Sequence, residues 1–147
     1  PKMVNIADKK ITKREALAKA ILFLGKEIIS RFDDKELRTK KGPVFQTAII
    51  AGIQAVKKTS ELIPMCHPLM IDGVDINIEI IDEEHIEILC KVSIEGKTGV
   101  EMEALTGANI AALTVYDMCK SISQKMIIKE VKLLEKTGGK SDIKLNK

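Results

Sequence analysis

Two neighbouring segments alternate polar and apolar residues with period two, and this pattern constrains the fold more than any other feature. The first segment covers residues 71–80 and the second covers residues 85–94. Such alternation is typical of strands that bury one face and expose the other. The polar stretch Asp82–Glu84 between them is short enough to form a hairpin loop. The chain therefore contains an antiparallel pair of strands at its centre.

Two longer segments repeat apolar residues at the spacing of a helix. In the segment from Val100 to about Ile122, a single stripe contains Leu105, Ala108, Ala112, Val115, Cys119 and Ile122. A second segment, from Phe45 to about Leu62, places Ile49, Ile53, Val56 and Ser60 on one face. Gly42-Pro43 precedes this helix and Pro64 ends it.

The segment from Thr12 to Leu24 carries conflicting signals. A capping box formed by Thr12 and Glu15 favours a helix, whereas the residues that follow also fit a strand buried on both faces. Residues 126–134 are rich in β-branched side chains and predict a strand, and residues 26–32 predict a short helix. One more strand at the front completes a ferredoxin-like βαββαβ order, so we expect Thr12–Leu24 to be that strand. The predicted fold class is α+β, an antiparallel sheet covered by helices on one face.

Length and composition favour a single domain over residues 1–147. A chain of 147 residues with 45% hydrophobic residues can bury one substantial core. The glycine-rich piece at residues 136–147 is expected to be a mobile tail unless a ligand orders it.

Charge and cysteine content exclude several classes of partner and place the chain in the cytoplasm. A formal net charge of +3 is too small for a general nucleic-acid binder. The apolar runs are shorter than the ~20 residues that cross a membrane, and the N-terminal residues do not resemble a signal peptide. Cys66, Cys90 and Cys119 are odd in number and form no C-x-x-C pair, which indicates reduced thiols and no metal site.

Familiar nucleotide-binding motifs are incomplete in this chain. Gly96-Lys97-Thr98 and Gly139-Lys140-Ser141 resemble the end of a P-loop, but each lacks the glycine five positions before Gly-Lys. No G-x-G-x-x-G sequence follows a strand, and the predicted strand at 86–94 offers no aromatic side chains on which RNA bases could stack.

The stretch Leu62–Leu69 places a histidine between two prolines. Pro64 and Pro68 remove backbone donors and bias the preceding residues toward extended geometry, so residues 65–67 should lie on a stiff connector. A rigid loop that presents the imidazole of His67 is suited to binding, although a lone histidine more often has a structural role.

Charged side chains near both ends of the long helix are further candidates. Asp117 and Lys120 are three residues apart, so they can pair on one helical face. A surface salt bridge is the simplest interpretation, but the apolar surroundings predict partial burial of the pair. Glu101 is explained by the positive end of the helix dipole, whereas Glu103 falls on roughly the side of Asp117. Lys97 and Lys136 adjoin Gly or Thr in loops that could bind anions.

Together these segments resemble one family, the molybdenum-cofactor biosynthesis protein C (MoaC) family of cyclic pyranopterin monophosphate synthases. The resemblance runs from Met3 to Ser141. It is carried by Lys41-Gly-Pro-Val-Phe45, Ala51-Gly-Ile-Gln-Ala55, Leu62-Ile-Pro-Met-Cys-His-Pro-Leu69, Gly96-Lys-Thr-Gly-Val-Glu-Met-Glu-Ala-Leu-Thr106, Leu113-Thr-Val-Tyr-Asp-Met-Cys-Lys120 and Lys136-Thr-Gly-Gly-Lys-Ser141.

The resemblance implies a ferredoxin-like domain assembled as a hexamer, a trimer of dimers, with active sites at subunit interfaces. The implied substrate is a cyclised dihydroguanosine triphosphate, which is rearranged to cyclic pyranopterin monophosphate with loss of diphosphate. The implied catalytic residues are Asp117, Lys120 and Lys41. The implied substrate-binding residues are Met65, Cys66, His67, Met102, Glu103 and, on shorter matching strings, Arg14 and Lys136. The sequence departs from the family pattern at Asn5, where Asp is usual, and at Pro43, where an acidic residue is common.

The implied chemistry suits these residue types. Proton transfers on the ring call for an acid and a base, and a cluster of cations would lower the pKa of Lys41 or Lys120. We expect His67, Arg14, Lys136 and Lys97 to hold phosphate and ring oxygens. No cofactor is predicted, although Mg²⁺ can accompany the triphosphate.

Two other functions remain open from the sequence. One is a nucleotide-binding or ligand-sensing oligomer on a ferredoxin-like fold, which would bind tightly without turnover. The other is a structural oligomer, which predicts that the polar residues named above do not converge.

Overall fold

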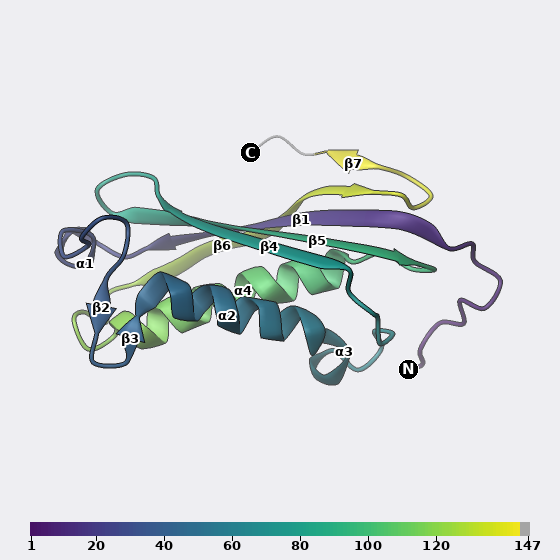
Figure 1. Cartoon of the computed structure of the whole chain (residues 1–147), viewed down its shortest axis with the longest axis horizontal. Helices are drawn as coiled ribbons and strands as arrows, with labels where there is room; N and C mark the ends of the chain where they lie inside the picture. The colour runs from purple at the N-terminus through teal and green to yellow at the C-terminus, as the bar shows by residue number, and fades with distance from the viewer. Residues whose placement is uncertain (145–147) are drawn as a thin grey trace.

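The computed structural model describes residues 1–144, which form a layer of strands and a layer of helices. A curved five-stranded sheet lies on one side, and the two long helices cover a single face of it (Figure 1). The sheet contains β1 (Thr12–Phe23), β4 (Gly73–Ile80), β5 (His85–Gly96), β6 (Ile127–Thr137) and β7 (Ile143–Lys144). The long helices are α2 (Val44–Lys57) and α4 (Glu101–Cys119).

The strand order confirms the predicted fold class. The strands lie in the order β4-β5-β1-β6-β7, and every neighbouring pair is antiparallel. The first six large elements, β1, α2, β4, β5, α4 and β6, give the βαββαβ arrangement expected of a ferredoxin-like domain. The predicted central hairpin is β4 and β5, which pair from Gly73 with Ser93 to Ile80 with Ile86.

β1 is the central strand, so the local signal for a helix at Thr12 is overruled. The chain pairs with β5 on one side and β6 on the other. Ala16, Ala18, Ala20 and Leu22 alternate toward the helices and are buried. The Thr12 hydroxyl donates to the Gly138 carbonyl across the sheet instead of capping a helix. Pairing on both edges satisfies the backbone N–H and C=O groups along the strand, whereas a capping box satisfies only N–H groups at the start of a helix.

The second predicted helix is interrupted near its end. α2 stops at Lys57, and a single turn, α3 (Thr59–Leu62), follows. The buried Thr59 hydroxyl donates to the carbonyls of Ala55 and Val56 and so ends α2. The buried face also differs from the prediction, because Ala48, Gly52 and Ala55 face the core while Ile49 and Ile53 are only half-buried.

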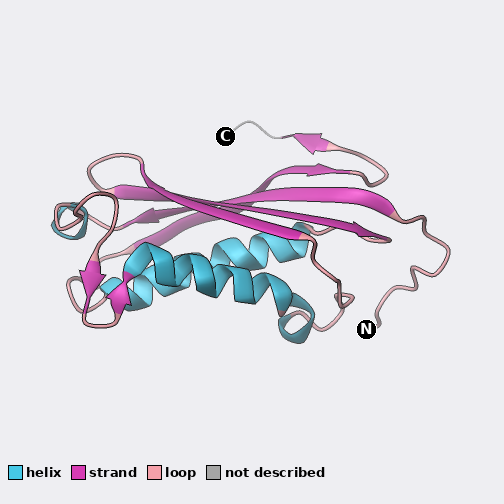
Figure 2. Ribbon diagram, in the orientation of Figure 1, coloured by secondary structure: helices cyan, strands magenta, loops and turns pink. Residues whose placement is uncertain are grey.

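The smaller elements lie at the ends of the layers (Figure 2). α1 (Lys26–Ile29) is a single turn, shorter than the predicted helix over 26–32. β2 (Arg38–Thr39) and β3 (Gly42–Pro43) form a small hairpin that the sequence did not predict. Residues 136–144, part of the predicted tail, form the end of β6, a turn and β7, and residues 145–147 lie outside the described residues. The mobility of this tail stays a prediction. None of the helices formed by residues 1–144 has the length and apolar character that a membrane span requires.

Two glycines allow α2 and α4 to cross at close range. A Cβ atom added at Gly107 would lie 2.6 Å from the Cys90 sulfur and 2.7 Å from a Val56 methyl group. A Cβ atom added at Gly52 would lie 3.0 Å from the Gly107 carbonyl oxygen. The helix backbones therefore touch where any larger residue would push them apart.

We predict that Gly107→Ala destabilises the fold even though alanine is the better helix former. The buried Cys90 and Val56 must shift to admit a methyl group, and such overpacking costs about 1–3 kcal/mol. The gain in helix propensity is only about 1 kcal/mol. Urea denaturation should show a net loss of up to about 2 kcal/mol in the free energy of unfolding.

Asn109→Ala is the matched control on the exposed side of the same helix, and it should change stability by less than about 0.5 kcal/mol. A Gly107→Ala protein that is more stable than the original chain would show that the helices do not need this close approach.

Candidate functional site

All three predicted catalytic residues converge at the C-terminal end of α4. The Asp117 carboxylate lies between two ammonium groups, 2.8 Å from Lys41 Nζ through Oδ2 and 2.8 Å from Lys120 Nζ through Oδ1. Lys41 reaches it from the tip of the β2–β3 hairpin, where Thr39 pairs with Gly42 and the backbone at Gly42 has a φ of +117°. We call these three side chains the lysine–aspartate cluster.

The lysine–aspartate cluster is about half exposed. The three side chains are between 47% and 54% exposed, which agrees with the partial burial predicted from the apolar stretch around Asp117. The apolar residues Val115, Met118 and Cys119 turn into the core, which leaves Asp117 and Lys120 on the side of α4 that faces outward.

The charges within the cluster determine its protonation. Hydrogen bonds from Lys120 and Lys41 lower the pKa of Asp117 to about 2. The same contact raises the pKa of Lys120, because the carboxylate stabilises the ammonium form. The expectation that neighbouring cations lower the pKa of this lysine is therefore wrong for Lys120, because the Asp117 carboxylate has the larger effect on it.

Five of the predicted substrate-binding residues line one hollow at the opposite end of α4. The hollow has a volume of about 280 Å³. Its wall contains Met65, Cys66, His67, Met102 and Glu103, together with Leu69, Thr98, Gly99 and Glu101. One side of the hollow is formed by residues 65–67, which lie between Pro64 and Pro68 and which we call the proline-braced connector. The first turn of α4 forms the other side. We call this hollow the α4 N-terminal pocket.

Burial raises the pKa of two groups in this pocket, Glu103 and Cys66. Glu103 is only 4% exposed, and burial raises the pKa of its carboxyl. Burial also raises the pKa of the Cys66 thiol, and the negative charges of Glu103 and Glu101 raise it further. A thiol with a raised pKa is a poor nucleophile near neutral pH, which fits a binding role for Cys66 better than a catalytic one.

Glu101 joins the pocket through an ion pair that the sequence did not reveal. Lys136 Nζ on β6 donates to Glu101 Oε1 at 3.0 Å. Burial raises the pKa of Glu101, but hydrogen bonds from its own backbone N–H and from Lys136 outweigh that effect, so the pKa is lowered overall. In the sequence, the helix dipole alone explained the position of Glu101. The ion pair was missed because Lys136 lies 35 residues away along the chain.

The remaining basic residues have partners within the chain. Arg14 is 8% exposed, and its guanidinium donates to the carbonyl oxygens of Gly96 and Lys97 at 3.0 and 3.3 Å. The Lys97 ammonium donates to the Ala7 carbonyl at 3.3 Å. His67 Nε2 lies 2.7 Å from the Val4 carbonyl oxygen. His67 lines the α4 N-terminal pocket, and Arg14 lines a small adjoining hollow that shares Gly99 and Glu101 with it. All three basic groups are engaged by backbone carbonyls.

The lysine–aspartate cluster and the α4 N-terminal pocket do not meet within one chain. Glu103 and Asp117 are 14 residues apart on a continuous helix, which separates them by about 21 Å at 1.5 Å per residue. The chain therefore brings the predicted site residues together as two groups at opposite ends of α4.

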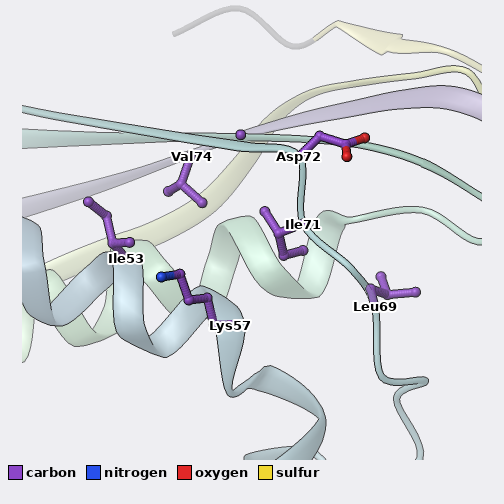
Figure 3. Close-up of a pocket in the computed structure, with 7 residues that line it drawn as sticks. Ile53, Lys57, Leu69, Ile71, Asp72 and Val74 are labelled. Atoms are coloured by element: carbon purple, nitrogen blue, oxygen red, sulfur yellow. The ribbon is translucent and has the colours of Figure 1, made fainter.

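A separate hollow of about 330 Å³ lies on the other side of Leu69, but no predicted site residue lines it (Figure 3). Its wall is mainly apolar, with Ile53, Ile71 and Val74. Figure 3 shows Lys57 and Asp72 pointing away from one another. The Asp72 carboxylate accepts a hydrogen bond from the Glu95 backbone N–H. Without converging polar groups, this hollow is not a candidate for the chemistry.

Within residues 1–144, no group of three or more His, Cys, Asp or Glu side chains could hold a metal ion. The entry of Mg²⁺ with the triphosphate stays a prediction.

Comparison with known proteins identifies the family. The model of the MoaC family matches residues 3–139, which include both groups of site residues. The chain belongs to the MoaC family.

Several relatives in the MoaC family are about half identical to this chain. A cyclic pyranopterin monophosphate synthase of Helicobacter pylori (strain HPAG1) is 52% identical, with 96% of this chain and 89% of the relative covered. The enzyme of that name from Xanthomonas campestris pv. campestris (strain 8004) is 49% identical, with 97% and 87% covered. A molybdenum cofactor biosynthesis bifunctional protein of Synechocystis is 54% identical over 97% of this chain, which spans 42% of that longer protein.

We predict that Asp117 titrates about two pH units below an ordinary aspartate, near pH 2 against the usual 3.8. Its folded pKa is lowered, so the carboxylate stabilises the fold above the unfolded pKa. That contribution is lost as the pH falls through the folded pKa. NMR titration of the side-chain carboxyl carbons measures the midpoint.

Lys120→Met should raise this midpoint toward 3.8, because it removes the largest cause of the shift. Lys144→Met, at an exposed lysine on β7, is the control and should leave it unchanged. A midpoint near 3.8 in the original chain would contradict the geometry of the cluster.

Proposed function

We propose that this chain converts a cyclised dihydroguanosine triphosphate (3′,8-cyclo-7,8-dihydro-GTP) to cyclic pyranopterin monophosphate and diphosphate, a step of molybdenum cofactor biosynthesis. The observation that supports this most directly is the Asp117 carboxylate held between Lys41 and Lys120 at 2.8 Å on each side. Membership of the MoaC family and the names of the relatives from Helicobacter and Xanthomonas agree with it.

The lysine–aspartate cluster is suited to acid catalysis and charge stabilisation. With a raised pKa, Lys120 is an ammonium at neutral pH, so it can donate a proton or stabilise a developing negative charge. With a pKa of about 2, Asp117 is a weak base, and we assign it the role of orienting the two lysines. When a sugar-derived hydroxyl attacks the α-phosphorus, the bond to the departing diphosphate breaks, and the two ammonium groups can balance its charge.

The α4 N-terminal pocket is suited to holding the ring. Met65 and Met102 offer apolar surface, and the buried Glu103 offers a carboxyl that can pair with ring N–H groups. Arg14, Lys97 and Lys136 place positive charge near this end, where phosphate oxygens could replace the backbone carbonyls and the Glu101 carboxylate they now contact.

We further propose that a complete site forms between two copies of the chain. About 21 Å separates the two groups of residues along α4, which is too far for a substrate of this size to contact both in one chain. A neighbour that places its α4 N-terminal pocket against the lysine–aspartate cluster would complete the site. A hexamer built as a trimer of dimers, which we propose for this chain, would provide such contacts through its symmetry.

The remaining parts of this proposal concern the state of the chain. We propose that residues 1–147 act as one domain, since β1, α2, α4 and β5 share one apolar core. We also propose a cytoplasmic location, because Cys66, Cys90 and Cys119 are free thiols. A ligand-sensing oligomer is the alternative, and it would bind the nucleotide without releasing diphosphate.

Incubating the purified chain with the cyclised nucleotide should yield diphosphate and the cyclic monophosphate in equal amounts. Lys41→Ala and Asp117→Ala should each abolish this release, because each removes a member of the lysine–aspartate cluster while leaving the core intact. Circular dichroism and sedimentation check that fold and assembly are unchanged. Near-full activity in either variant would remove the residue from the catalytic assignment.

Mixed assemblies test the shared site. Asp117→Ala damages one end of α4 and Glu103→Gln damages the other, so each variant alone should be inactive. When the two are dissociated, mixed in equal amounts and reassembled, about one quarter of the sites should regain both intact ends by random pairing. Activity that stays at the level of the single variants would mean that each site is completed within one chain.

A further inference from the structure

The segment before the β2–β3 hairpin contains a carboxylate that binds three backbone amides. Glu36 Oε1 accepts hydrogen bonds from the N–H groups of Leu37 and Phe45, both at 2.9 Å. Its Oε2 accepts a third from the N–H of Gln46 at 3.1 Å. No pattern in the sequence predicts this arrangement, because the charged residues from Asp33 to Lys41 resemble an ordinary solvated turn.

These bonds replace the cap that α2 lacks. Pro43 precedes the helix and has no side chain that can accept a hydrogen bond, and no side-chain cap forms there. The first N–H of the helix, from Val44, donates instead to the Leu37 carbonyl at 2.9 Å. Residues 36 and 37 therefore satisfy the first three N–H groups of α2, which helix geometry leaves without intrahelical partners.

The turn that delivers Glu36 has an uncommon backbone. Asp33 and Glu36 bond each other through both backbone groups, at 2.8 and 3.1 Å. Between them, Asp34 and Lys35 have φ values of 48° and 68°, in the left-handed region that favours glycine. Conformations of this kind persist where the surrounding structure requires them. Here the turn places the Glu36 carboxylate where it can accept hydrogen bonds from three backbone N–H groups.

Glu36 therefore joins the base of the hairpin to the start of α2. Leu37 leads into β2 and Val44 follows β3, so both legs of the hairpin are held where they meet the helix. The tip of the same hairpin carries Lys41, whose ammonium lies 2.8 Å from Asp117 on α4. The position of Lys41 relative to Asp117 thus depends on the attachment that Glu36 makes.

We propose that Glu36 is a positioning residue, which acts on the reaction through Lys41 and does not touch substrate. The inference rests on the catalytic role proposed above for Lys41. Without the Glu36 carboxylate the hairpin can move away from α2, and a displacement of about 1 Å of a catalytic group can lower a rate by about 100-fold.

Glu36→Ala should lower kcat for diphosphate release by about 10- to 100-fold per folded molecule, with KM nearly unchanged. Glu36→Gln should lie between this variant and the original chain, because its amide oxygen can still accept from Leu37 and Phe45 while its NH₂ group faces the Gln46 N–H. Hydrogen exchange of the Val44 amide, which reports on the hairpin base, should become faster in the same order.

Thr59→Val is the matched control at the opposite end of α2. It removes the hydroxyl that donates to Ala55 and Val56 and should lower stability without changing kcat or the exchange of the Val44 amide. This contrast separates a general loss of helix stability from a displaced hairpin.

Two results would overturn the proposal. A Glu36→Ala protein with kcat within about twofold of the original despite faster Val44 exchange would show that the hairpin need not be held for catalysis. Unchanged Val44 exchange in Glu36→Ala would show that the carboxylate does not hold the hairpin at all, and this readout needs no turnover. Absence of diphosphate release from the original chain would instead reject the proposed function.

Discussion

The close crossing of α2 and α4 at Gly52 and Gly107 is the contact on which the arrangement of the molecule depends. Because the two backbones approach too closely to admit a side chain, the helices pack as one layer on the sheet. The helices run in opposite directions (Figure 1), so the start of α2 lies near the end of α4 and the end of α2 lies near its start. Each end of α4 therefore lies beside a segment that flanks α2. The β2–β3 hairpin, which precedes α2, lies at the C-terminal end of α4, and the proline-braced connector, which follows α2 and α3, lies at the N-terminal end.

The two ends of α4 have different chemical character. At the C-terminal end, two ammonium groups share one exposed carboxylate, and this charge balance keeps Asp117 ionised and Lys120 protonated. At the N-terminal end, burial keeps the Cys66 thiol protonated and raises the pKa of Glu103. One end thus supplies fixed positive charge beside a carboxylate, and the other supplies an apolar hollow with a carboxyl group. The proposed reaction, which combines ring rearrangement with departure of diphosphate, would use both.

The sequence predicted the parts of the fold whose signal is local. The alternation in β4 and β5 and the helical spacing in α4 follow from side chains that must alternate or repeat to face one core. The strand at Thr12 followed only from topology, since its capping box favoured a helix. The β2–β3 hairpin was missed because two-residue strands carry no periodicity. Glu36 was missed because a carboxylate that binds distant amides looks like any other charged turn residue.

The sequence by itself determined the βαββαβ order, the family and the residue types of the site, because periodicity and motifs are properties of neighbours along the chain. Only the tertiary structure decided which charges meet. Lys41 and Asp117 are 76 residues apart, and Lys136 and Glu101 are 35 apart. The protonation of these groups depends on distance and burial, so the lowered pKa of Glu101, to which the distant Lys136 contributes, could not be read from its neighbours in sequence. The separation of the proposed site residues into two groups likewise follows from the tertiary structure, in which α4 is one unbroken helix.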